Sequence, residues 1–63
     1  METYNFSGVK VKVIDCTVGD WVDFRVAEVY DAAGNFAYGI RTTAKGEQAA
    51  KIAYADALRF RYI

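Results

Sequence analysis

Three runs of alternating apolar residues precede one alanine-rich run, and this change of period constrains the fold more than any other feature. Val9, Val11 and Val13 alternate with lysines, and residues 22–26 and 36–40 follow the same period of two. From Ala44 onward the apolar residues recur about every 3.6 positions, which is the period of an α-helix. The sequence therefore predicts an α+β chain in which a sheet is followed by one helix.

Short turns containing glycine and aspartate separate the predicted strands. We expect strands over about residues 4–15, 21–30 and 35–41, with Gly8 marking a bend or bulge inside the first strand. Consecutive strands joined by short turns are usually antiparallel neighbours. The predicted fold is therefore a three-stranded antiparallel β-meander packed against one C-terminal α-helix.

The helix is expected to begin near Thr42 or Thr43, whose side chains can accept a hydrogen bond from a free amide of the first turn. Winding the chain at about 100° per residue gathers six mostly small residues on one stripe. They are Ala49, Ala50, Ala53, Tyr54, Ala57 and Phe60. Residues 58–63 return to a period of two, so they predict either the end of the helix or a short terminal strand.

Chain length and apolar content together predict an exposed apolar surface. The 63 residues make a single domain, residues 1–63, of which 54% are hydrophobic. A domain of this size buries only about 60% of the surface that its unfolded chain exposes. We therefore expect a dimer contact or a partner surface, although scattered exposed apolar residues are the simpler alternative.

Charge and cysteine content narrow the class of protein. Eight basic residues balance eight acidic ones, so neither a strongly basic nucleic-acid footprint nor an acidic mimic of DNA is indicated. The sequence has no secretory signal and no apolar stretch of membrane-spanning length. A lone cysteine, Cys16, then favours a cytoplasmic protein.

Side chains that carry chemistry are scarce. The chain has no histidine, and neither a metal-ligand set nor a phosphate-binding glycine pattern is present, so we expect no metal and no cofactor. Cys16 is expected to pack as a small apolar residue. Five acidic residues gather near the turns and the middle strand, where turn formation explains them better than acid–base catalysis. These are Asp15, Asp20, Asp23, Glu28 and Asp31. The composition favours a binding module over an enzyme.

The alternation also assigns side chains to the two faces of the predicted sheet. The face toward the helix should carry Val9, Val11, Val13, Val22, Phe24, Val26, Phe36, Tyr38 and Ile40. The uncovered face should carry Lys10, Lys12, Trp21, Asp23, Arg25, Ala27, Ala37, Gly39 and Arg41.

Five residues of the uncovered face are the predicted partner-binding site: Trp21, Arg25, Lys10, Lys12 and Arg41. Tryptophan and arginine are enriched at binding hot spots, and the cations suit phosphates or the carboxylates of a partner. The alternative is an ordinary solvated sheet face. Ile52 marks a second surface on the helix flank, either a dimer contact or a packed or singly exposed residue.

Several residues resemble two families of DNA-binding domains. Residues 26–31 (VAEVYD), then Tyr38-Gly39, Thr43-Ala44 and Ala49-Ala50, are similar to the AP2-type domain and to integrase arm-binding domains. This resemblance implies a three-stranded sheet on one C-terminal helix, with the sheet reading DNA. It also implies that Ala27 and Val29 face the helix, which is the opposite of what the alternation of the middle strand predicts.

In size and type the chain also resembles the small phage-encoded inhibitors of bacterial defence, including anti-CRISPR proteins. That resemblance implies a protein partner in the host-cell cytoplasm, such as a nuclease or a CRISPR effector complex, blocked by steric occlusion. The leading hypothesis is thus a small protein-binding module of this kind. The alternatives are a DNA-binding domain that uses the same sheet face and a subunit that only dimerises.

Overall fold

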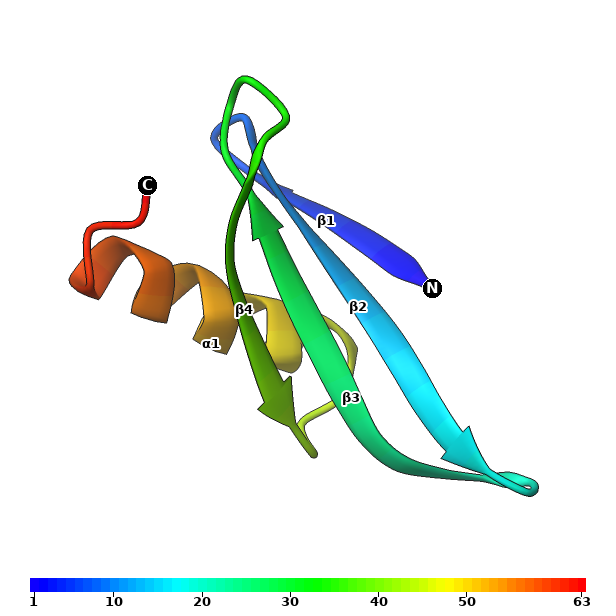
Figure 1. Ribbon diagram of the computed structural model, residues 1–63. Helices are drawn as coiled ribbons and strands as arrows, with labels where there is room; N and C mark the ends of the chain where they lie inside the picture. The colour runs from blue at the N-terminus through cyan, green and yellow to red at the C-terminus, as the bar shows by residue number, and fades with distance from the viewer.

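The computed structural model describes residues 1–63 and has an α+β fold, in which one helix lies across one face of an antiparallel sheet (Figure 1). The strands are β1 (Glu2–Phe6), β2 (Val9–Val18), β3 (Trp21–Tyr30) and β4 (Phe36–Thr42), and the helix is α1 (Gly46–Arg59). They pair in chain order, so the sheet is a meander. The predicted sheet with a C-terminal helix is confirmed, but the sheet has four strands instead of three.

The additional strand arises because the first predicted strand turns back on itself at Gly8. Ser7 and Gly8 have φ angles of 54° and 88°, and the type I′ turn of a two-residue hairpin loop requires positive values at both positions. The Asn5 side-chain oxygen accepts a hydrogen bond from the Gly8 amide at 2.9 Å. Gly8 therefore makes a tight turn between β1 and β2, and the predicted bend or bulge within one strand is wrong.

The hairpin of β2 and β3 extends beyond the rest of the sheet. β1 pairs with β2 no further than Val13, and β4 pairs with β3 no further than Arg25. Residues 16–24 therefore form a two-stranded projection, which we call the arm and which is visible in Figure 1 as the end farthest from the helix. Gly19, with a φ of 61°, turns the chain at its tip.

The hairpin of β3 and β4 closes through the predicted turn at residues 31–35. The Asp31 carboxylate accepts hydrogen bonds from the amides of Ala33 and Asn35, and the Asp31 carbonyl accepts one from Gly34. These bonds replace the ladder contacts that the backbone loses where it reverses. Asp31 therefore stabilises the turn through its carboxylate, as aspartate typically does at the start of a turn.

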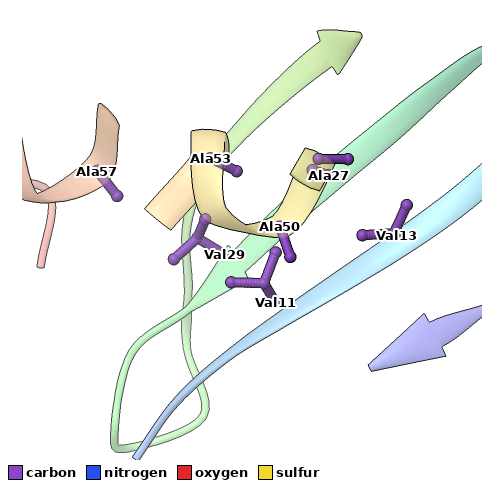
Figure 2. Packing of buried hydrophobic residues seen from close by; sticks show 8 residues of the cluster. Val11, Val13, Ala27, Val29, Ala50, Ala53 and Ala57 are labelled. Atoms are coloured by element: carbon purple, nitrogen blue, oxygen red, sulfur yellow. The ribbon is translucent and has the colours of Figure 1, made fainter. Parts of the chain in front are cut away.

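The core is small and made of small residues. Eight residues are buried, and valines are the largest fully buried side chains (Figure 2). The cluster consists of Val11, Val13, Ala27, Val29, Ala49, Ala50, Ala53 and Ala57. The predicted alanine stripe of the helix is thereby confirmed, except that Phe60 is 54% exposed. Since alanine methyl groups line α1, the helix backbone can approach the sheet closely.

Aromatic pairs close the two ends of this core. Phe6 stacks on Tyr54 with ring centroids 4.8 Å apart, and Tyr38 stacks on Tyr62 at 5.0 Å. Each pair joins a strand to the helix or to the segment after it. The half-buried aromatic rings therefore shield a core whose fully buried residues are no larger than valine.

The helix begins later than predicted. α1 starts at Gly46, its N-cap residue is Lys45, and no side chain caps it. The Thr42 hydroxyl instead accepts a hydrogen bond from the Ala44 amide at 3.0 Å, which stabilises the connection between β4 and the helix. The predicted threonine cap is therefore wrong. At 14 residues α1 is not long and apolar enough to cross a membrane.

The chain after α1 forms a C-terminal cap, so no terminal strand is present. The Tyr62 amide donates to the Ala57 carbonyl at 2.8 Å, and the Arg61 amide donates to the Leu58 carbonyl at 3.1 Å. This is the Schellman arrangement, and Arg61 occupies its left-handed position with a φ of 61°. The cap turns the last residues back toward β4, where Tyr62 reaches Tyr38.

Candidate functional site

The middle of β3 is oriented opposite to the prediction from its alternation, which places Phe24 and Val26 toward the helix and Ala27 away from it. Residues directly opposite each other in an antiparallel pair lie on the same face of a sheet. Ala27 is opposite the buried Val13, so it faces the helix, whereas Val26 is opposite Ile14 and faces away. Phe24 likewise lies opposite Cys16 on the far side from the helix.

This finding corrects two core assignments and one surface assignment. Phe24 and Val26 do not face the helix, and Ala27 is buried instead of uncovered. Val22 lies opposite Thr17 on the helix side of the sheet, as predicted, but it belongs to the arm and is 36% exposed, so it is not part of the core. The physical reason is that α1 covers only the half of β3 that holds Ala27 and Val29, and the irregularity next to Val22 changes the phase of the alternation along the strand.

A bulge brings one further aromatic residue to the outside. The register of β3 and β4 shifts between Val29 and Tyr30, and beyond the shift Phe36 lies opposite Tyr30. Phe36 is 59% exposed, so its predicted place in the core is wrong. Tyr38 and Ile40 do pack against the core, as predicted.

The face of the sheet that no element covers is the candidate site, and we call it the open face. The register places on it Thr3, Asn5, Lys10, Lys12, Ile14, Cys16, Phe24, Val26, Glu28, Tyr30, Phe36, Gly39 and Arg41. Its middle is apolar, three cations lie around it, and Glu28 is its one carboxylate. A sheet with one solvated face usually alternates apolar inward and polar outward, so this apolar centre is unusual.

Cations lie over two of the aromatic rings of the open face. The Lys12 ammonium is 4.8 Å from the ring centroid of Tyr30, and the Arg41 guanidinium carbon is 3.8 Å from that of Phe24. A cation at this distance from a ring face is attracted by its negative potential. The charges therefore lie beside apolar surface instead of being dispersed into solvent.

The Tyr30 hydroxyl donates a hydrogen bond of 3.1 Å to Glu28, the neighbouring carboxylate on the same face. This bond, assisted by desolvation and by the negative charge, raises the pKa of Tyr30 above its ordinary value. Phe36 meets the Tyr30 ring edge-on, with centroids 5.8 Å apart. Tyr30 therefore contacts Lys12, Glu28 and Phe36 at the end of the open face where β3 ends.

Gly39 is the position that lets Phe36 lie flat on β4. A β-carbon built on Gly39 would be 3.3 Å from the Phe36 Cζ atom. This is closer than an ordinary van der Waals contact, so a side chain here would displace the ring. The glycine and the aromatic ring therefore form one continuous apolar surface.

Arg25 does not belong to the open face, contrary to the prediction. Its Nε donates to the Asp15 carboxylate at 2.9 Å, and its Nη1 donates to the Thr43 carbonyl at 3.2 Å. Its side chain is only 15% exposed. Arg25 thus joins the sheet to the connection between β4 and α1, on the helix side.

The other four predicted site residues are accessible, but they do not form one cluster. Lys10, Lys12 and Arg41 lie on the open face, and Trp21, 72% exposed, lies on the arm with its strand partner Val18. Ile52 is 37% exposed on the helix. Alternation along β2 places Val18 on the same side as Cys16, so the arm continues the open face.

Sequence reasoning missed the aromatic residues of the open face: Phe24, Tyr30 and Phe36. One usable signal was Gly39, because a glycine in a strand leaves space that a neighbouring aromatic ring can cover. The molecular surface has no enclosed pocket, and no group of three histidine, cysteine or acidic side chains is placed to hold a metal. The open face therefore provides a flat surface on which another molecular surface can pack.

Comparison with family models, with curated proteins and with solved structures finds no match to this chain.

Proposed function

We propose that this protein is a non-enzymatic binding module that docks a protein partner on its open face. The observation that carries the proposal is the placement of Ile14, Phe24 and Val26 at the centre of an uncovered sheet face. Contiguous apolar surface of this kind is typical of interaction sites. The buried core lies on the other side of the sheet, so core formation does not explain these apolar residues.

The charges indicate what kind of protein surface would fit. Lys10, Lys12 and Arg41 outnumber Glu28, so the complementary surface is apolar at its centre and carries carboxylates around it. A standard interface buries about 800 Å² on each partner. That is about a fifth of the 4220 Å² accessible surface of this chain, an area that the open face and the arm together can supply.

A narrower form of the proposal is steric inhibition. In this form the protein occludes the working surface of a host defence complex, as the resemblance in type to phage-encoded inhibitors suggests. The support for it is the small size of the chain together with a single contact face. A capture experiment is needed to identify the partner.

A second candidate, binding of single-stranded nucleic acid, is favoured by one specific observation. Tyr30 and Phe36 lie among Lys10, Lys12 and Arg41, and aromatic rings interleaved with cations form stacking platforms for bases. Such binding weakens steeply with added salt, because phosphate contacts release counterions. A protein partner held by apolar contact depends on salt far less.

The test compares two matched double variants in affinity capture from a bacterial lysate. The open-face variant is Lys10→Glu with Phe36→Ala, and the helix control is Lys51→Glu with Leu58→Ala. All four side chains are exposed, so both variants should fold, which circular dichroism checks. The proposal expects the open-face variant to lose the captured protein and the control to keep it.

Equal capture by both variants would remove the open face as the site. Fluorescence anisotropy with a labelled oligothymidylate tests the second candidate directly. Binding that falls steeply with added salt and is lost in the open-face variant would reassign the face to nucleic acid.

A further inference from the structure

The open face and the arm together have opposite charges at their two ends. The arm, residues 16–24, contains Asp20 and Asp23 and no lysine or arginine. Because the whole chain is neutral, the remaining residues carry a net charge of +2. At the other end of β2 lie Lys10 and Lys12, which we call the lysine end. Neither the two aspartates nor the two lysines form an ion pair within the chain.

The apolar centre lies between these two ends. Counted along β2, the midpoint between Lys12 and Val18 is Asp15, and its neighbours on the open face are Ile14 and Cys16. The adjacent residues of β3 are Val26 and Phe24. The lysine end has a net positive charge although Glu28 lies opposite Lys12, the one charge at the centre is Arg41 opposite Val26, and the arm is negative. The net charge of the surface therefore changes from positive to negative along a single direction.

A surface with this order is complementary to itself when a second copy is reversed. Resting on the proposed function of the open face, we propose that its partner is a second copy of this chain, packed face to face with its strands running the opposite way. A two-fold axis through the apolar centre then brings each arm over the lysine end of the other copy. The contact is made twice, and the dimer is closed.

The two most exposed apolar residues of the arm are accounted for by the same arrangement. Val18 and Trp21 are 59% and 72% exposed in the single chain. In the reversed pair they meet the lysine end of the other copy, where Phe36 is the most exposed ring. Two sheets packed in this way lie about 10 Å apart, which side chains of this size fill.

The helix side also has exposed apolar residues, Ile52, Leu58 and Phe60, but it offers no comparable charge complementarity. Glu47 pairs with Lys51 within α1 at 3.6 Å, and Asp56 pairs with Arg59 at 2.7 Å. Charges that are already paired within one helix give a second copy little to bind. The open face is therefore the surface through which self-association is expected.

The test exchanges the charges of the two ends in separate variants. One variant carries Asp20→Lys and Asp23→Lys on the arm, and the other carries Lys10→Glu and Lys12→Glu at the lysine end. Each variant alone then places like charges together, so we expect its dimer dissociation constant to rise at least about tenfold. An equimolar mixture restores both contacts and should dimerise as the wild type does.

Sedimentation velocity measures the outcome, with a wild-type mass of twice 7.0 kDa expected. The control Lys51→Glu on the helix should dimerise normally. A wild type that stays monomeric, variants that dimerise unchanged, or a mixture that fails to recover would each overturn the proposal. Species larger than a dimer in the mixture would also do so, because they indicate open head-to-tail chains.

The failure of this inference is distinguishable from the failure of the proposed function. A monomer whose lysate capture is still lost in the open-face variant refutes self-association and leaves the docking of another protein in place. A monomer that binds oligothymidylate through the same face refutes both.

Discussion

Val29 and Val26 form a matched pair that tests the orientation of β3, on which the open face depends. The two valines lie in the same strand, three residues apart, and differ in the face to which they point. Val29 is completely buried under the helix, whereas Val26 is partly exposed on the open face. Replacing each with alanine removes the same two methyl groups from opposite sides of the sheet.

The expected magnitudes follow from burial. Removing two buried methyl groups loses about 1.6 kcal/mol of transfer free energy, at about 0.8 kcal/mol for each. The cavity left among the surrounding side chains brings the cost of Val29→Ala to about 2–3 kcal/mol. Val26→Ala leaves no enclosed cavity, so its cost should stay below about 1 kcal/mol. A chain of 63 residues has about 3–9 kcal/mol of stability in total, so this difference is large.

Urea unfolding followed by circular dichroism measures both variants. Equal slopes of the free energy of unfolding against urea concentration would show that the midpoints report stability alone. A loss for Val26→Ala that equals or exceeds the loss for Val29→Ala would refute the assigned orientation. The open face and both proposals built on it would then be withdrawn.

Three further predictions concern the C-terminal cap at Arg61, the hydroxyl group of Tyr30 and the side-chain contacts of Arg25. Arg61→Gly should raise the free energy of unfolding by about 0.5–1 kcal/mol in urea unfolding, because glycine adopts the left-handed cap conformation without a steric penalty. Tyr30→Phe should flatten the stability profile above about pH 10, measured as melting temperature against pH. The folded-state pKa of Tyr30 lies above its unfolded value, so its contribution is complete below the unfolded pKa and is lost as pH rises through the folded one. Arg25→Met should lower the free energy of unfolding by about 1–2 kcal/mol in urea unfolding, because two bonds are lost. The Thr43 carbonyl loses its hydrogen-bond donor, and Asp15 loses its ion pair.

Each of these three has an outcome that contradicts it. A destabilised Arg61→Gly variant would show that the cap does not carry the assigned conformation. An unchanged alkaline profile for Tyr30→Phe would mean that its hydrogen bond to Glu28 does not persist in solution. A variant Asp15→Asn that costs as much as Arg25→Met would place the whole effect in the ion pair, against the bond to Thr43.

The candidate site was predictable only in part from the sequence. Lys10, Lys12 and Arg41 fall on the open face as predicted because the alternation keeps one phase over residues 9–14 of β2 and 38–42 of β4. The face on which Arg25 lies could not be predicted. A charged residue in an apolar run is equally compatible with a solvated face and with a largely buried position where it bonds to neighbouring segments. The aromatic residues of the open face were missed for the related reason that apolar side chains are ordinarily assigned inward.

Local residue preferences determined the sheet-then-helix order, the turn at residues 31–35, the inward valines of β2 and the alanine stripe of α1. Each of these depends on a period or a turn chemistry that a short segment carries by itself. The orientation of β3 was decided only by the tertiary structure, because the apolar residues of the strand change phase: Val22, Phe24 and Val26 are at even positions, and Ala27 and Val29 are at odd positions. Burial selected the phase that places Ala27 and Val29 beneath the helix, and the other phase was left to form the open face.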